Sequence, residues 1–422
     1  MTTYSPPGEE HAAFTQWAVE QGIEMNGVEP ARFPGRGLGM VATKKIEANE
    51  VMVSVPLSAM LTVDCIPPSF INLFNGISNH GLLAAFLTHG DTESLKKYTL
   101  WRATWPKRQD FEDGMPVLWP EKLRVSNSKH HVSPASTTSI ALPPSASGLW
   151  NTFRKKKLVE EYKTKNQNIL AQQEQRLQSA WKDVVAVFPD TDWEVYSYHW
   201  LIVNTRSFFY LMPGEDVPED TNDAMALVPF ADYFNHRDDA QCEVGFDGQK
   251  YTFQATKSYE KGEEIYMSYG PHSNDLLLVE YGFCPEENGS DVLYLDDIIF
   301  RDFTTAEKEE LLFQQYYGDY QITIDSGPCF RTEVAASMKC MSRREWRNYI
   351  QGRGAAPNTI KVNNVIRDWI EVYTKEANFA INILQAVLKA ETEDSTKSKI
   401  QALVGRWNQI KHLCDQTTLN LE

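Results

Sequence analysis

Three alternating glycines stand in the stretch GRGLGM at residues 35–40. Because glycine has no Cβ, this spacing indicates a backbone that turns tightly or that a ligand approaches closely. A nucleotide is one ligand that glycine-rich loops bind. Taken alone, however, a triplet of this kind indicates a structural turn.

The flanks of the triplet exclude a dinucleotide loop. Such a loop follows a buried strand and leads directly into a helix whose N-terminus faces the phosphates. Upstream, EMNGVEPARFP is too polar, and too interrupted by Pro30 and Pro34, for a parallel core strand. Downstream, VATKKIEANEVMVSVP sets β-branched residues around a polar turn and predicts two short strands. The glycines therefore belong to the first loop of a small β unit.

Two later segments carry polar and aromatic side chains that could contribute to a site. LVPFADYFNHRDD contains Asp232, Asn235 and His236. EEIYMSYGPHSNDLLLVEYGFCP contains Tyr269-Gly270 and, twelve residues after Tyr269, Tyr281-Gly282-Phe283. Taken singly these are ordinary, since Asn-His at a strand end caps a turn and Tyr-Gly ends a strand.

Periodicity predicts the elements that must position these residues. Apolar residues recur at helical spacing within 14–23 and in HGLLAAFLTHG. CEVGFDGQKYTF predicts a hairpin with Asp247-Gly248 at its turn, and the strand that leads to Tyr269 shows an alternating pattern. From about residue 300 the pattern is helical, with a capping box predicted at Thr304.

Two polar segments precede residue 190. Residues 126–148, SNSKHHVSPASTTSIALPPSASG, have the composition of an exposed loop, and we expect disorder there. His130 and His131 lie in this loop without a nearby carboxylate or thiol, so we predict no metal site. Residues 152–188 are highly charged, and their apolar spacing predicts a long surface helix or a helix pair.

Composition and charge restrict the class of protein. The chain has 422 residues, enough for two or three domains, and 42% of them are apolar, which favours folded globular units. The formal charge of −16 argues against a general nucleic-acid binder, whose phosphate contacts need a basic face. An acidic protein instead attracts basic segments of other proteins.

Cysteine spacing and hydropathy bear on location. The six cysteines show no C-x-x-C pair and no zinc-finger spacing, so we expect reduced and mostly buried thiols. The N-terminus lacks a basic stretch followed by an apolar run, and the chain has no apolar stretch of membrane-spanning length. We expect a cytoplasmic or nuclear protein without membrane association.

Together and in this order, the motifs resemble the SET-domain protein methyltransferases, specifically the Rubisco large-subunit methyltransferase-like branch. The resemblance covers nearly the whole chain, from TQWAVEQG through the FNH, YMSYG and EYGF motifs to the C-terminal helices. It implies an α+β fold, with small β-sheets around a pseudoknot-like active site, a helical insertion and an all-α C-terminal substrate-binding domain. The implied boundaries are 11–80 and 200–295 for the two SET segments, 81–199 for the insertion, and 296–422 for the substrate-binding domain.

The same resemblance implies the roles of the site residues. The cofactor would be S-adenosylmethionine, Tyr269 would be the catalytic residue, and Tyr281 would line the channel for the target side chain. Arg206 would pair with the methionine carboxylate, a contact that suits its forked guanidinium. The remaining cofactor-binding residues implied by the motifs are Arg36, Gly37, Leu38, Asp232, Asn235, His236, Gly282 and Phe283.

The resemblance implies a protein-lysine N-methyltransferase that acts on a non-histone protein, such as a ribosomal protein or a translation factor. We expect a monomer that binds a basic substrate segment, without direct contact to nucleic acid. Two alternatives stay open: a protein-histidine N-methyltransferase of the same fold, and a catalytically idle SET module that binds a partner. Intact glycine, FNH and tyrosine motifs favour an enzyme.

Overall fold

The computed structural model of the chain describes residues 3–124, 141–153, 166–218 and 223–421. The chain divides into two compact units, which are described separately: unit 1 is Met1–Phe111 with Gln175–Pro271, and unit 2 is Glu112–Glu174 with His272–Glu422. The helical insertion predicted at 81–199 is thus shared between the units, and the four predicted domain boundaries stay a prediction.

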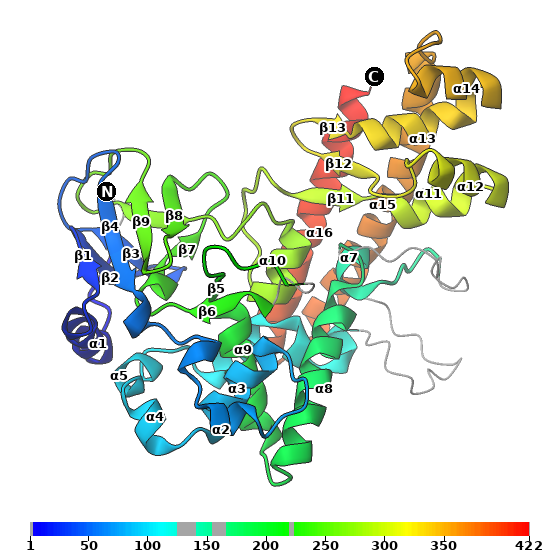
Figure 1. Cartoon of the computed structure of the whole chain (residues 1–422). Helices are drawn as coiled ribbons and strands as arrows, with labels where there is room; N and C mark the ends of the chain where they lie inside the picture. Colours follow the sequence, from blue (N-terminus) through cyan, green and yellow to red (C-terminus); the bar gives the residue numbers. More distant parts are fainter. Residues whose placement is uncertain (1–2, 125–140, 154–165, 219–222, 422) are drawn as a thin grey trace. The chain divides into compact units, whose positions relative to one another are not determined.

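The strands of unit 1 form three sheets (Figure 1). Two have four strands, in the orders β1-β4-β9-β8 and β2-β3-β10-β7, and the third pairs β5 with β6. All neighbours are antiparallel except β7 and β10, which are parallel. The strands are β1 (Glu24–Met25), β2 (Val28–Phe33), β3 (Gly37–Ala42), β4 (Val51–Pro56), β5 (Ser207–Phe209), β6 (Met225–Leu227), β7 (Asn235–His236), β8 (Cys242–Phe246), β9 (Lys250–Ala255) and β10 (Glu264–Met267).

The glycine motif forms the turn of the β2–β3 hairpin, as predicted. Gly35 and Gly37 both have φ near +75°, a backbone conformation that favours glycine. The preceding segment, too polar for a parallel core strand, forms the antiparallel edge strand β2. Pro30 fits there because an edge strand does not need every N–H for pairing.

Helices pack beside these sheets. Figure 1 shows α2, α3, α4, α5 and α9 gathered below the strands of unit 1. Phe14, Trp17 and Ala18 on α1 are buried, which confirms the predicted amphipathic helix. The helices that lie wholly or partly in unit 1 are α1 (Glu9–Glu20), α2 (Pro68–Ile71), α3 (Asn79–His89), α4 (Thr92–Lys96), α5 (Thr99–Arg102), α6 (Arg108–Gly114), α8 (Ile169–Val187) and α9 (Trp193–Arg206).

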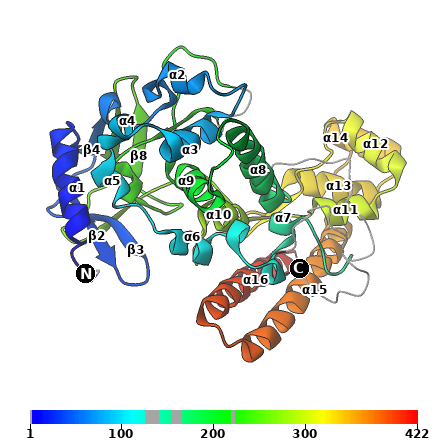
Figure 2. The same cartoon turned by 90° about the horizontal axis from the view of Figure 1, so that it is seen from below.

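Unit 2 is mainly helical. Figure 2 shows its two longest helices, α15 and α16, as an antiparallel pair. The predicted capping box of Thr304 and Glu307 is present at α12. Besides the predicted helices, a small sheet of order β11-β12-β13 is present. The elements are α7 (Pro144–Ser147), α10 (Asn274–Tyr281), β11 (Val292–Tyr294), α11 (Asp296–Asp302), α12 (Thr305–Phe313), β12 (Gln321–Thr323), β13 (Gly327–Pro328), α13 (Phe330–Cys340), α14 (Arg343–Ile350), α15 (Thr359–Ala390) and α16 (Asp394–Asn420).

No helix within the described ranges is long and apolar enough to cross a membrane. All six cysteines are free, but the prediction that they are mostly buried is wrong. Only Cys414 is buried, while Cys65 is exposed in a short 3₁₀ turn at Val63–Cys65.

The prediction of disorder at 126–148 is wrong for its last eight residues, 141–148, which are ordered and almost wholly buried. They include α7, and the indole of Trp407 on α16 donates to the Ala141 carbonyl at 2.7 Å. Their small and apolar side chains fill space beside long helices, which a composition typical of loops does not reveal. His130 and His131 lie outside the described residues, as do residues 154–165 of the predicted helix, whose later part is α8.

The buried carboxylate of Glu376 anchors the end of this segment to α15. It accepts hydrogen bonds from the main-chain N–H groups of Asn151 and Thr152, at 2.7 and 2.8 Å, and from both of their side chains. Trp150, between Thr152 and α7, stacks edge-on against Tyr373 with ring centroids 4.8 Å apart. A single α15 carboxylate thus holds a segment more than two hundred residues away in sequence.

We expect Glu376→Leu to lower the thermal unfolding midpoint by several degrees. The substitution leaves buried N–H donors without an acceptor, at a cost of about 1–3 kcal/mol for each group. Glu371→Leu on the same helix is the matched control, because Glu371 is 61% exposed and its ion-pair partner, Lys375, is exposed as well. Differential scanning calorimetry measures both, and equal midpoints would show that the Glu376 anchor contributes nothing.

Candidate functional site

The three motifs of unit 1 meet at one buried carboxylate, that of Glu264, the first residue of β10. Its Oε1 accepts from Asn235 Nδ2 at 2.9 Å, and its Oε2 accepts from Arg36 Nε at 2.9 Å. The Tyr266 hydroxyl also donates to Oε2, at 2.6 Å. The Glu264 side chain is 3% exposed. One charge therefore joins the glycine hairpin, the FNH strand and the YMSYG strand.

Asn235 ties the same three segments together through its amide. Its Nδ2 also donates to the Leu38 carbonyl at 2.9 Å, and β7 pairs in parallel with β10. A Cβ on Gly39 would lie 2.7 Å from Asn235 Nδ2 and 2.8 Å from Glu264 Oε1. A Cβ on Gly37 would meet no protein atom within 4 Å. Close packing thus requires glycine at position 39, while position 37 requires it for its backbone conformation.

Tyr269 is held at both its hydroxyl and its main chain. The hydroxyl donates to the Phe234 carbonyl at 2.8 Å, and the N–H donates to His236 Nδ1 at 3.0 Å. Because Nδ1 accepts this bond, the proton of the neutral ring is on Nε2. His236 is buried, and its ring centroid lies 5.1 Å from that of Tyr269. His236 thus orients Tyr269.

Asp232 and Arg206 form an ion pair beneath the FNH segment. Arg206 Nε lies 3.6 Å from Asp232 Oδ2, and Nη1 donates to the Asp232 main-chain carbonyl at 3.1 Å. The Trp101 indole donates to the same carboxylate at 3.1 Å. Burial raises the pKa of Asp232, and the Arg206 charge opposes this shift. The structure gives Arg206 a partner within the protein, so its contact with a cofactor carboxylate stays a prediction.

Phe230, the residue directly before the 3₁₀ turn that contains Asp232, has a strained main-chain conformation. Its φ of 70° and ψ of −36° lie in a region that non-glycine residues rarely adopt, at a cost of about 1–3 kcal/mol. The side chain is fully buried and packs edge-on against Tyr233, with centroids 5.5 Å apart. Packing therefore fixes the direction in which the chain enters the 3₁₀ turn Ala231–Tyr233 and the FNH strand.

Tyr281, Gly282 and Phe283 belong to unit 2, at the end of α10. Gly282 ends the helix with φ of 81°, and a Cβ there would lie 3.0 Å from Met115 Sδ. Burial raises the pKa of Tyr281 to about 12. The positive φ at the helix end and the close approach of Met115 are sufficient to explain why residue 282 is glycine, without any contact to a ligand. Whether these three residues complete a pocket with Tyr269 stays a prediction.

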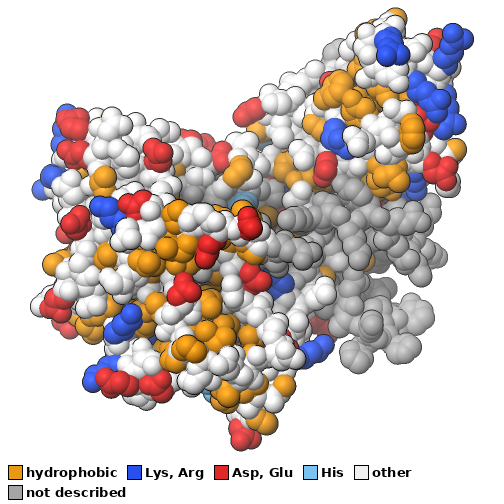
Figure 3. Space-filling view, viewed as in Figure 1, with side chains coloured by type: hydrophobic (Ala, Val, Ile, Leu, Met, Phe, Trp, Pro, Cys, Tyr) orange, Lys and Arg blue, Asp and Glu red, His pale blue; other side chains and the backbone are white. Residues whose placement is uncertain are grey.

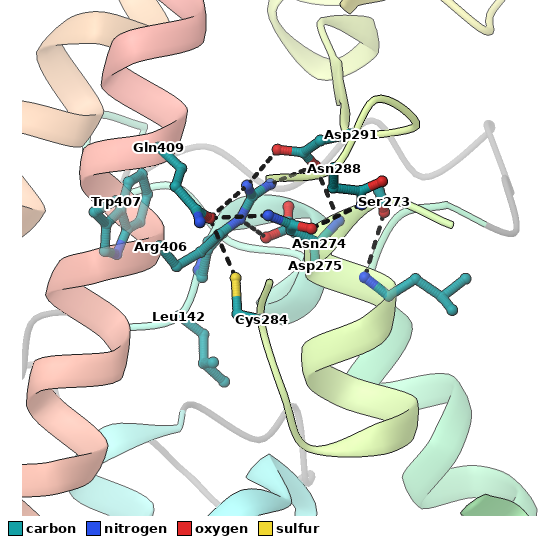
Figure 4. Close-up of polar contacts among 12 residues, drawn as sticks. Leu142, Ser273, Asn274, Asp275, Cys284, Asn288, Asp291, Arg406, Trp407 and Gln409 are labelled. Carbon is teal, nitrogen blue, oxygen red and sulfur yellow. Dashed lines mark hydrogen bonds and ion pairs between the residues drawn. The ribbon is translucent and has the colours of Figure 1, made fainter. Parts of the chain in front are cut away.

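A buried arginine on α16 positions α10 (Figure 4). Arg406 donates from Nε to Asp275 at 2.7 Å, in the first turn of α10, and from Nη1 to Asp291 at 2.6 Å. Gln409, one turn further along α16, donates to the Pro285 carbonyl just after Phe283, at 2.7 Å. Contacts at both ends of the segment thus fix the residues between them.

Sequence reasoning missed Glu264, Gly39 and Trp101 as parts of the site. Alternation in EEIYM assigns Glu264 to the face opposite Ile265 and Met267, where a charged residue normally faces solvent. Gly39 stood in the quoted triplet without being distinguished from its neighbours. No local signal marks Trp101, because its role depends on a carboxylate 131 positions away.

The described parts of the chain contain no group of three or more His, Cys, Asp or Glu side chains placed to hold a metal. What unit 1 offers is a tyrosine hydroxyl held by a main-chain carbonyl, beside a rigid hairpin with an open glycine. Such an arrangement can orient reacting groups and can bind a ligand through backbone atoms.

Comparison with known proteins agrees with this geometry. A ribosomal lysine N-methyltransferase, set11 of Schizosaccharomyces pombe, is 34% identical over 161 residues, which are 38% of this chain and 40% of that enzyme's length. Human SET domain-containing protein 4 is 22% identical over 90% of this chain and 84% of its own. A crystal structure of the SET domain of LSMT bound to MeLysine and AdoHcy superposes with a TM-score of 0.60 and 15% identity, over 98% of this chain and 93% of that one.

The structural likeness confirms the predicted fold class, an α+β SET fold followed by a helical C-terminal region. The family pattern of the SET domain matches residues 37–270, more than half of the chain. This range begins in the glycine hairpin and ends directly after Tyr269, and so encloses the site of unit 1 apart from Arg36, the residue before its first position. The chain belongs to the SET-domain family.

Proposed function

We propose that this protein is an S-adenosylmethionine-dependent protein-lysine N-methyltransferase. The observation that carries the proposal is the convergence of the intact glycine, FNH and tyrosine motifs on Glu264. Two relatives support lysine as the target: set11 is named a ribosomal lysine N-methyltransferase, and mouse SETD6 is named an N-lysine methyltransferase. Solved structures of similar fold are titled as bound to AdoMet or to methyllysine.

The residues of unit 1 fit this cofactor. The backbone of Arg36, Gly37 and Leu38 would approach it, since the space beside Gly37 is open. Asn235 and His236 would contribute further contacts to its amino and adenine ends. Glu264 holds Arg36 and Asn235 in place without having to touch the ligand.

The cofactor supplies a methyl group on a positively charged sulfur, and the protein must present a neutral amine behind it. Lysine has a pKa of about 10.4, so neutralising it at pH 7 costs about 4–5 kcal/mol. A dry channel and a nearby sulfonium charge both lower that cost. The Tyr269 hydroxyl donates to Phe234, so its oxygen acts as an acceptor that orients an amine N–H.

The substrate we propose is a non-histone protein that presents its lysine in a basic segment. An overall charge of −16 supports attraction of such a segment. A ribosomal protein or a translation factor would fit this description. A cytoplasmic or nuclear location and a monomeric state complete the proposal.

Tyr269→Phe is expected to lower the rate of methyl transfer about a hundredfold or more, because the acceptor that orients the amine is lost. Binding of S-adenosylmethionine should change little. Transfer of labelled methyl groups to proteins of an undermethylated extract measures the first quantity, and titration calorimetry measures the second.

Mass spectrometry of the labelled protein then distinguishes lysine from histidine as the acceptor. Tyr210→Phe is a matched control in the same unit, since the Tyr210 hydroxyl donates to Asp64 Oδ2 at 3.2 Å and contacts neither Phe234 nor Glu264. Full activity of Tyr269→Phe would exclude the catalytic role of Tyr269. Absence of cofactor binding by the unmodified protein would exclude the proposed function itself.

Gly37→Ala and Gly39→Ala should both weaken cofactor binding, but only Gly39→Ala should also lower the thermal unfolding midpoint by several degrees. The new methyl group at position 39 would push Asn235 away from Glu264, whereas at position 37 it meets no protein atom and would enter the open space that the cofactor is proposed to use. Calorimetric titration with S-adenosylmethionine measures binding, and differential scanning calorimetry measures the midpoint. Unchanged cofactor binding by Gly37→Ala would exclude the proposed approach of the cofactor to this residue.

A further inference from the structure

The end of α13, the helix α14 and the residues that follow it in unit 2 carry a basic surface on an acidic protein. Residues 339–361 contain six Lys or Arg and one Glu, in a chain whose formal charge is −16. Figure 3 shows Lys and Arg side chains beside hydrophobic ones on the part of unit 2 that these helices form. None of the residues assigned above to the cofactor or to the target side chain lies on these helices.

The positive charge is only partly balanced within the protein. Arg347 and Arg343 share one carboxylate, Glu310 on α12, at 2.7 and 2.8 Å from their Nε atoms. The hydrogen bonds from Arg347 and Arg343 lower the pKa of Glu310 to about 2. Arg344 and Arg353 are exposed and form no ion pair with any residue that the structure describes. Glu345 on α14 adds a second carboxylate, whose Oε2 accepts from Ser342 in the capping box of that helix. Four arginines and two carboxylates leave this part of the surface net positive.

Large apolar side chains are exposed next to these arginines. Leu312 and Phe313 follow Glu310 at the end of α12 and are 64% and 80% exposed. Phe330, at the start of α13, is 56% exposed and lies edge-on to Tyr316, with centroids 6.2 Å apart. Grouped apolar exposure of this kind marks interaction surfaces.

We infer that this basic-apolar face, made by Leu312, Phe313, Phe330, Arg343, Arg344 and Arg347, binds an acidic segment of a protein partner that also carries apolar side chains. Arginine forks bind carboxylates in bidentate fashion, and buried aromatic and arginine side chains dominate the energy of protein interfaces. The carboxylates of such a partner would pair with the arginines, and its apolar side chains would pack against Leu312, Phe313 and Phe330.

A short acidic segment fits this face better than a nucleic acid does. Screening by salt limits electrostatic attraction to about 8 Å at physiological ionic strength. A short acidic segment bound at the arginines is therefore attracted by them and is little repelled by acidic residues elsewhere on the protein. A long polyphosphate would extend beyond them and meet a chain whose acidic residues outnumber its basic ones.

The test measures binding of a fluorescein-labelled peptide, in which Leu and Phe are set among Asp and Glu, to the full-length protein by fluorescence anisotropy. We expect saturable binding that weakens with added salt. The double variant Arg344→Glu with Phe313→Ser should raise the Kd about tenfold or more, since it reverses one charge and removes one apolar anchor. Both positions are exposed, so the fold should be retained, as circular dichroism can verify.

The matched control is Lys389→Glu with Leu419→Ser, which makes the same kinds of change at exposed positions on α15 and α16. It should bind the peptide like the unmodified protein. Equal weakening in both double variants, or no saturable binding at all, would overturn the inference. Tighter binding of a single-stranded RNA of equal charge would overturn it in favour of nucleic acid. The peptide contains no lysine, so the result does not depend on methyl transfer.

Discussion

The site of unit 1 depends on the burial of one carboxylate, that of Glu264. Removing a carboxylate from water costs several kcal/mol unless cations and hydrogen-bond donors replace the solvent. Glu264 obtains those donors from Arg36, Asn235 and Tyr266. Each of the first two comes from a different motif of the chain, so the carboxylate is satisfied only when the hairpin and the FNH strand have both reached β10. The energetic demand of a single group therefore fixes the relative positions of the three motifs.

In unit 2 a buried positive charge, that of Arg406, likewise fixes the positions of segments that are distant in sequence. The guanidinium of Arg406 is completely buried, and Asp275 and Asp291 neutralise it. A buried ion pair adds little net stability compared with well-packed apolar side chains, but it tolerates few alternative geometries. Here the ion pair fixes the position of the start of α10, and the helix in turn fixes the position of Tyr281 at its end. Each unit thus fixes its own segments by means of a buried charge whose partners are distant in sequence.

Local signals predicted local structure well. The β2–β3 turn followed from its glycines, α1 from its apolar spacing, and the capping box of α12 from Thr304 and Glu307. What the sequence could not reveal depends on distant partners. A composition typical of exposed loops did not disclose that 141–148 are buried, because the groups that bury them come from α15 and α16.

The site shows the same division between local and distant determinants. Asn235 and Tyr269 were identified by resemblance, and the structure places each against a main-chain carbonyl or carboxylate. Glu264 was overlooked because alternation along a strand says which residues share a face, without saying which face is buried. Gly39 contributes to this arrangement, because its missing side chain leaves room for the Asn235 and Glu264 side chains to meet.

These contacts also bear on how a methyl transferase of this design would handle protons. His236 uses Nδ1 to accept the Tyr269 N–H, so that nitrogen does not act as a base. Burial and the hydrogen bond to Glu264 raise the pKa of Tyr266 to about 12, so that phenol stays protonated at neutral pH. The Tyr269 hydroxyl is committed as a donor to Phe234. None of these three groups is suited to remove the lysine proton, so in the proposed reaction the Tyr269 hydroxyl would act by orienting an amine that is already neutral.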